Sequence, residues 1–182
     1  MKSPEEIKVY KEARVFVRPV QSLLYSMRDE MQRLRGMPRV IKGAKIRFHG
    51  GPQDYSKTFV DPHSGITQAF HIHYVDLAPQ GKSQKHGHQN EALLYILEGR
   101  GYEIHDGKTY EWNAGDLVLI HGGSVHQHFN ADPDKPARGI IFKAKPLCMF
   151  MNLIYQDFVE GSPKEPTPGH EDYRPIQLRE LL

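Results

Sequence analysis

Several features that would define a class of protein are scarce or absent in this sequence. The chain of 182 residues has one cysteine, Cys148, so an internal disulfide is impossible and nothing indicates an oxidising compartment. No apolar run approaches membrane-spanning length, and the first residues lack the apolar stretch of a signal peptide. The net charge of +2 is small, and no run of Lys or Arg alternates with aromatic residues. We therefore expect a cytoplasmic protein that binds neither membrane nor nucleic acid.

The composition is that of an ordinary globular chain. Hydrophobic residues make up 38% and charged residues 25%, which excludes a disordered or fibrous protein. A chain of this length fits one domain with an extension or two, and buries roughly 70% of its unfolded surface. Three zones separate: an N-terminal helical extension over residues 1–45, a β-domain over 46–146, and a C-terminal helix and tail over 147–182.

The two outer zones contain the helical signals. Apolar residues recur at helical spacing over residues 20–35 and predict an amphipathic helix, which Gly36 and Pro38 end. We expect this helix to pack against its own β-domain or against a second copy. Residues 147–158 predict a short helix, and the prolines in 161–169 predict a flexible tail.

The central zone contains short strands and turns. The expected strands are Thr67–Leu77, Glu91–Leu97, Gly101–His105, Lys108–Trp112, Asp116–Ile120 and Arg138–Ala144. Asp106-Gly107 is typical of a two-residue hairpin turn. Many short antiparallel strands without helices between them predict an all-β fold, either a closed barrel or a jelly roll.

Three histidines are the most informative residues. His86 and His88 are separated by one residue, so on an extended strand both imidazoles lie on the same face. His126 follows about 40 residues later, and on another inward-facing strand it would complete a facial triad around a divalent metal. Imidazole suits Fe, Zn, Cu and Ni, so the pattern predicts a transition-metal site. Glu91 as a fourth ligand is an open alternative.

Two motifs around these histidines resemble the cupin family. The second motif, residues 115–130, follows the cupin pattern Gly-x5-Pro-x-Gly-x2-His-x3-Asn, except that His121 stands in place of the Pro. The first keeps the His-x-His pair and Gly99, but Ala92 replaces the usual metal-binding Glu. The resemblance covers Val75 to Lys145 and implies a cupin jelly-roll β-barrel, with the N-terminal amphipathic helix and the short C-terminal helix outside it.

Within cupins, residues 86–99 are similar to gentisate 1,2-dioxygenase-like proteins. Those relatives also have Ala at the position of Ala92, and share the ending His126-Gln-His128-Phe-Asn130. The resemblance implies Fe(II) bound through His86, His88 and His126, with Mn, Ni, Co or Zn as other possible metals. It also implies a small-molecule substrate and dioxygen as partners. An Arg that lies near the substrate in these relatives is replaced here by Leu94.

Three neutral ligands have a chemical consequence of their own. They leave a divalent metal with its full charge, which favours an anionic chelating substrate such as a catecholate, an enolate or a 2-hydroxy acid. We therefore expect a metal-dependent dioxygenase that cleaves a C–C bond in an aromatic or enolisable compound. Two alternatives stay open: a non-catalytic metal- or ligand-binding module, and a non-oxidative lyase, isomerase or decarboxylase.

Other residues are candidates for the pocket or its frame. His128 shares a strand face with His126 and is expected to act as a catalytic proton shuttle or to orient the substrate, or else to pack as a polar residue. Weaker candidates for the pocket are His73, with His71 beside it, Gln84 and Tyr95. His121 is expected to be structural, and Gly123 and Asn130 to form turns.

Leu94 and the outer apolar residues lead to two further expectations. Leu94 faces the metal side of its strand and offers an apolar wall, so the substrate is expected to be neither gentisate nor salicylate but a chelator with a neutral group on that side. A cation such as Arg47 or Arg138 would restore carboxylate binding. The predicted helix at 20–35 and the apolar stretch 149–154 add surface that favours a homodimer.

Overall fold

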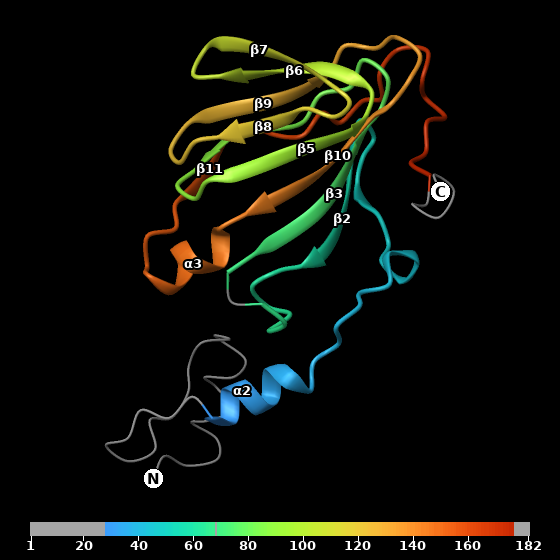
Figure 1. The fold of residues 1–182 in the computed structure, drawn as a ribbon. Helices are drawn as coiled ribbons and strands as arrows, with labels where there is room; N and C mark the ends of the chain where they lie inside the picture. The colour runs from blue at the N-terminus through green and yellow to red at the C-terminus, as the bar shows by residue number, and fades with distance from the viewer. Residues whose placement is uncertain (1–27, 68, 177–182) are drawn as a thin grey trace.

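Two antiparallel sheets face each other and enclose the core (Figure 1). The structure is a computed structural model, and it describes residues 28–67 and 69–176. In spatial order, the six-stranded sheet contains β1 (His49–Gly50), β2 (Asp54–Val60), β3 (His71–Leu77), β10 (Ala137–Lys143), β5 (Ala92–Glu98) and β8 (Leu117–Ile120). The five-stranded sheet contains β11 (Gln156–Glu160), β4 (Lys85–His88), β9 (Val125–Asn130), β6 (Arg100–His105) and β7 (Lys108–Asn113). The expected all-β jelly roll is confirmed.

Side-chain alternation places the core between the sheets. Along β5, Ala92, Leu94 and Ile96 are buried, whereas the residues between them are exposed. Leu94 pairs with Ile141 of β10, and both belong to a cluster completed by Leu77, Trp112, Ile120 and Ala137. The core therefore fills the deep part of the space between the sheets and leaves one end to polar side chains.

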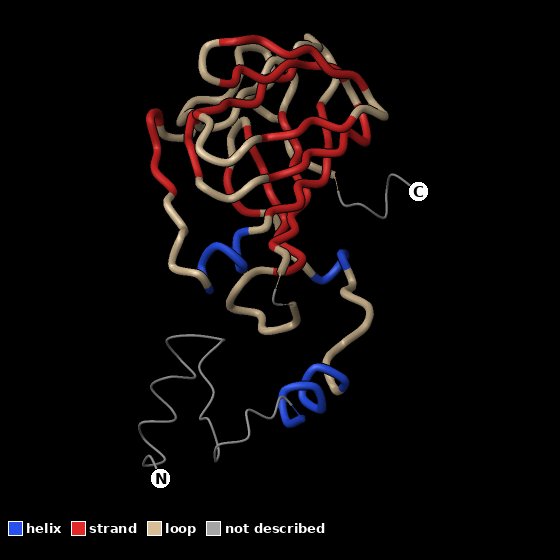
Figure 2. The backbone as a smooth tube through the Cα atoms, turned by 60° about the vertical axis from the view of Figure 1, so that its left-hand side comes forward, coloured by secondary structure: helices blue, strands red, loops and turns tan. Residues whose placement is uncertain are grey.

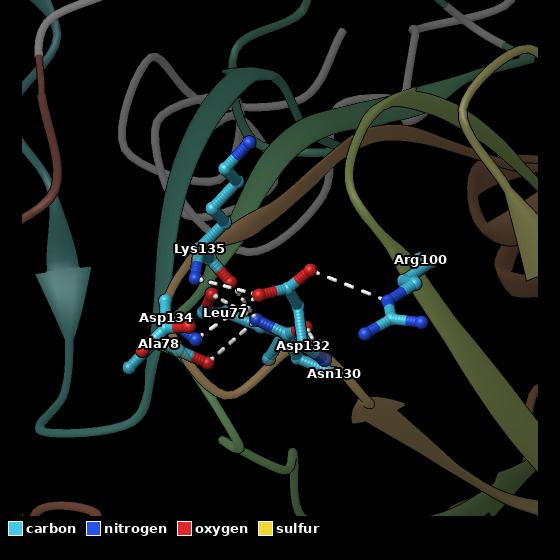
Figure 3. A network of polar contacts seen from close by, with 7 residues as sticks. All are labelled: Leu77, Ala78, Arg100, Asn130, Asp132, Asp134 and Lys135. Carbon is cyan, nitrogen blue, oxygen red and sulfur yellow. Dashed lines mark hydrogen bonds and ion pairs between the residues drawn. The ribbon is translucent and has the colours of Figure 1, made fainter.

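Two turns predicted from the sequence position the strands. Asp106 and Gly107 both have positive φ, 49° and 82°, as a type I′ hairpin turn between β6 and β7 requires. Asn130 holds the loop that leads into β10 (Figure 3): its Nδ2 donates to the carbonyls of Ala78 and Lys135 at 2.9 and 2.8 Å, and its Oδ1 accepts from the Asp132 amide. Asn130 is therefore a turn former, as expected.

The N-terminal helix is partly described. Its last part forms α2 (Arg28–Arg35) and ends where the Gly36 amide donates back to the carbonyls of Gln32 and Arg33; residues 20–27 of the predicted helix lie outside the described residues. In both views α2 stands apart from the two sheets (Figures 1 and 2). Arg33 donates to the Gly65 carbonyl at 2.9 Å. Within the described residues, α2 therefore reaches the loop between β2 and β3 but does not lie on either sheet.

The C-terminal prediction is wrong in two respects. The helix α3 covers only Lys145–Phe150, and Gln156–Glu160 is not helical but forms the strand β11. The reason is tertiary, because β11 pairs with the edge of β4, where Phe158 lies opposite His86. No helix within residues 28–67 and 69–176 has the length and apolar character that crossing a bilayer requires.

Residues 161–176 are not a loose tail but lie along the β-domain. Gln53 donates to the Glu165 carbonyl at 2.8 Å, Thr167 is buried, and the Tyr173 hydroxyl donates to Asp76. Prolines prevent regular pairing in this segment, but they do not prevent an extended chain from packing. The zone boundaries at residues 45 and 146 stay predictions, although β11 extends the five-stranded sheet beyond residue 146.

Candidate metal centre and its cavity

Three buried imidazoles meet on neighbouring strands of the five-stranded sheet. His86 and His88 come from β4 and His126 from β9, and the pairing of these strands sets His86 opposite His126. The ring centroids of His126 lie 4.4 Å from His86 and 4.8 Å from His88. One nitrogen from each ring lies within 4.8 Å of the other two. The predicted triad is thus brought together, and alternation on β4 is the reason that both of its histidines face inward.

The hydrogen bonds of these rings leave one nitrogen of each for a ligand. The Nδ1 atom faces a backbone carbonyl in every case: Gln84 at 3.5 Å from His86, Asn90 at 2.7 Å from His88, and Ser124 at 3.2 Å from His126. A proton on Nδ1 leaves Nε2 as a lone-pair donor. Within the described chain, the buried Nε2 atoms of His88 and His126 have no hydrogen-bond partner. Buried polar atoms are normally satisfied, so these two fit a metal ion that is bound between them.

The electrostatics also favour the metal-binding form of the rings. Burial, and after it the positive charge of Lys143, lowers the pKa of His86 to about 3 and that of His88 to about 4. Burial and the charge of His128 hold the pKa of His126 far below its usual value. All three imidazoles are therefore neutral at pH 7, which is the state that coordinates a metal.

His128 lies beyond His126 on the same strand face and pairs with an acid that was not anticipated. Its Nδ1 lies 2.6 Å from Glu103 Oε2, and Trp112 donates to the other oxygen of Glu103 at 3.2 Å. Burial opposes the charge of His128, but the Glu103 carboxylate outweighs burial and raises the pKa of His128. Glu103 lies between Gly101 and His105 on the inward face of β6. Because side chains alternate with a period of two along a strand, the sequence could have indicated that Glu103 faces inward.

A cavity opens beside His86 and His128. Its apolar wall contains Val75, Leu77, Leu94, Ile96, Trp112, Ala137 and Ile141. Its polar lining contains Asp54, Ser56, His73, Gln84, Arg138 and Lys143. Leu94, His73 and Gln84 line this cavity, and their contact with a substrate stays a prediction. Asp54 and Lys143 were not anticipated; burial raises the pKa of Asp54 to about 6, and the charge of His128 counters part of that effect.

Other predicted residues lie elsewhere. Tyr95 is 42% exposed on the outer face, so its assignment to the pocket is wrong: it alternates with the inward Leu94. Glu91 is exposed, with its carboxylate 3.9 Å from His121, and the structure does not bring it to the three imidazoles. His121 is exposed as well, whereas a structural role suggested burial. His71 is half-buried, with its ring 5.1 Å from that of His73.

Arg138, a predicted source of positive charge for the substrate, is already paired. Its Nε donates to Asp76 at 2.9 Å, and its Nη1 donates to Glu98. Asp76 lies opposite Arg138 in the register of β3 and β10. Two carboxylates therefore balance the charge of this guanidinium, although Arg138 also lines the cavity.

Comparison with known proteins agrees with this fold and site. Residues 73–142 match the family model described as "Cupin domain". Over 97 residues the chain is 30% identical to gentisate 1,2-dioxygenase from Ralstonia sp. This match covers 53% of this chain and 26% of the dioxygenase. Over 75 residues it is 36% identical to acireductone dioxygenase 2 from Coprinopsis cinerea, covering 37% of each chain. The matches thus span between about a quarter and two fifths of these relatives.

Solved structures show the same fold. Salicylate 1,2-dioxygenase from Pseudoaminobacter salicylatoxidans, as adducts with gentisate, aligns with 73% of this chain and 34% of its own at 12% identity and a TM-score of 0.53. The polyketide cyclase RemF from Streptomyces resistomycificus covers 59% of this chain and 79% of its own at 18% identity and a TM-score of 0.51. Residues 73–142 therefore resemble a cupin domain in sequence, and the chain shares its fold with these structures. The chain is also similar in part to gentisate 1,2-dioxygenase and carries a three-histidine cluster.

Proposed function

We propose that the protein is a metal-dependent dioxygenase that holds Fe(II) through His86, His88 and His126. Its substrate is a small chelating aromatic or enolisable compound. The observation that carries this proposal is the set of three buried, neutral imidazoles, two of them with unsatisfied Nε2 atoms, of which His86 lines a cavity. The similarity to gentisate and acireductone dioxygenases supports the same chemistry. Mn, Ni, Co or Zn would suit the same ligands.

The residues around the triad would transfer a proton, orient the substrate and exclude water. Bound Fe(II) would supply Lewis acidity towards a chelating substrate and redox chemistry towards dioxygen. His128, held through Nδ1 by Glu103, would accept or donate a proton at Nε2 and orient the substrate. Leu94 and Ile141 would exclude water from the far side of the cavity.

Dioxygen uptake tests this function directly. We expect anaerobically purified protein loaded with Fe(II) to consume dioxygen when a chelating catechol, hydroxybenzoate or diketone is added, with about one O₂ per molecule of product. The measurement is an oxygen electrode coupled to mass spectrometry of the product. The zinc-loaded protein is the matched control, because Zn²⁺ has no redox chemistry.

The same experiment distinguishes the other functions. Product formation without oxygen uptake would replace the proposal with a lyase, isomerase or decarboxylase. Substrate binding without turnover, over the whole panel and with fully loaded iron, would indicate a binding module. A cytoplasmic location stays a prediction.

We also propose that the protein is a homodimer that pairs through the outer face of the six-stranded sheet. Exposed apolar side chains gather there on three neighbouring strands: Leu93, Tyr95, Leu97, Leu117, Leu119 and Phe142. The strand register brings Leu93 opposite both Leu119 and Phe142, and Tyr95 opposite Leu117, so the side chains form a continuous patch. Contiguous apolar surface of this kind is typical of interfaces.

Light scattering tests the dimer. We expect a mass of twice 20.9 kDa for the wild type at tens of micromolar. Leu119→Glu should give the monomer, because a charge within the patch would have to be desolvated on association. Lys108→Glu, on the edge strand of the other sheet, is the control and should leave the dimer intact. A monomeric wild type would refute the proposal.

A further inference from the structure

Lys143 is a cation that faces the cavity of the proposed metal centre. It is the last residue of β10 and lies opposite Ala92 of β5 and His71 of β3. Alternation along β10 puts Lys143 on the same face as Gly139 and Ile141, and all three line the cavity together with His86 and His128. Lys143 therefore shares one cavity with His86 of the triad and with the cavity's apolar wall.

Within the described ranges, Lys143 forms no direct ion pair with a carboxylate. Asp54, the acid that lines the same cavity, acts on Lys143 through its charge and raises the pKa of the ammonium group, but burial and the charge of Lys145 have larger effects in the opposite direction. Arg138, in contrast, is bound by Asp76 and Glu98. Burial and then the nearby charge of Lys145 lower the pKa of Lys143 to about 8, so the ammonium form still predominates at neutral pH but is costly. A bound anion would remove that cost.

Ala92 also leaves the positive charge of Lys143 without a partner on β5. The side chain that lies across from Lys143 on β5 is a methyl group, which offers the ammonium neither a hydrogen bond nor a countercharge. Next along that strand, Leu94 and its partner Ile141 are apolar. A ligand that enters the cavity therefore meets positive charge near the triad and hydrocarbon beyond it.

We propose that Lys143 binds a carboxylate group of the substrate while a neighbouring hydroxyl oxygen of the same molecule reaches the metal. This inference rests on the proposed function, because the triad must hold the metal. It assigns the substrate to hydroxy carboxylates, and it replaces Arg47 and Arg138 with Lys143 as the cation that restores carboxylate binding. From Leu94 we expected the substrate to have a neutral group on the side that faces this residue. That expectation then applies only to the part of the substrate that lies beyond the carboxylate.

Calorimetric binding to the zinc-loaded protein tests the role of Lys143 without turnover. The probes are salicylate and salicylamide, which share the ring and hydroxyl but differ in the charge of the second group. We expect Lys143→Met to weaken salicylate binding about tenfold to a hundredfold, the usual size for a hydrogen bond to a charged group, and to leave salicylamide binding within about twofold. Lys143→Arg should retain most of the salicylate affinity, because it keeps the charge.

Lys145→Met is the matched control. Lys145 is two residues away, donates to Gln156 at 3.1 Å and does not line the cavity, so its loss should leave the affinity for salicylate unchanged. Equal weakening in both lysine variants would indicate a general effect of charge and would overturn the proposal. So would equal salicylate affinity in wild type and Lys143→Met at equal zinc content, or a wild type that does not prefer salicylate to salicylamide.

Failure of the proposed dioxygenase function would look different. In that case salicylate binding would depend on Lys143 and on bound zinc, but the iron-loaded protein would consume no dioxygen with any hydroxy carboxylate. Such a result would keep the assignment of Lys143 and overturn the oxidative chemistry.

Discussion

Replacing His126 with Ala is expected to remove nearly all bound metal. His126 supplies one of three ligands, and its Nε2 has no other hydrogen-bond partner within the described structure. Loss of a residue that only supports a ligand already costs about 10–100-fold in metal affinity, so loss of a ligand should cost at least about 100-fold. His86→Ala and His88→Ala should behave in the same way. The measurement is elemental analysis after loading with Fe(II) and gel filtration, with metal affinity from competition with a chelator.

The control for this experiment is His121→Ala. His121 belongs to the same motif in the sequence, but its side chain is exposed and lies beside Glu91 rather than in the cavity. It should retain full metal content. Circular dichroism of each variant separates metal loss from unfolding. Retention of stoichiometric metal by His126→Ala would show that the three imidazoles are not the ligand set.

Replacing Asp76 with Ala is expected to destabilise the folded protein by about 3–5 kcal/mol. Asp76 is fully buried, accepts from Arg138 Nε at 2.9 Å and also accepts from the Tyr173 hydroxyl. Without Asp76, the buried Arg138 guanidinium keeps only the Glu98 carboxylate as a partner. The C-terminal segment also loses the hydrogen bond that Tyr173 donates to Asp76. The free energy of unfolding from urea titration of the metal-free protein is the measurement.

Arg100→Ala is the comparison for Asp76→Ala. Arg100 also forms an ion pair, with Asp132 at 3.2 Å, but its side chain is 60% exposed, so water replaces the lost interaction. Its removal should cost less than about 1 kcal/mol. If the two variants lost the same free energy of unfolding, burial would not explain the contribution of the Asp76–Arg138 pair to stability. A small loss in Asp76→Ala alone would show that Arg138 regains water or pairs fully with Glu98.

Local patterns in the sequence were sufficient for six of the strands and for bringing the three imidazoles together, but not for β2 or β11. A period of two needs no knowledge of the fold, so His86 and His88 could be placed on one face, and Leu94 could be placed inward on β5. Turn chemistry is equally local, which is why Asp106-Gly107 and Asn130 occupy the turns expected for them. The same alternation contradicts the placement of Tyr95, which is next to Leu94 and must face outward.

Only the tertiary structure decided which partners these residues meet. Glu103 reaches His128 because β6 pairs with β9 in one particular register, and Lys143 enters the cavity because β10 lies between β3 and β5. Residues 156–160 form a strand because the edge of β4 offers hydrogen bonds that a helix would leave unused. These contacts join residues far apart in the chain, and their free energy depends on strand register and burial. A single sequence therefore determined the triad and its strands, whereas the charges around the triad were determined by packing.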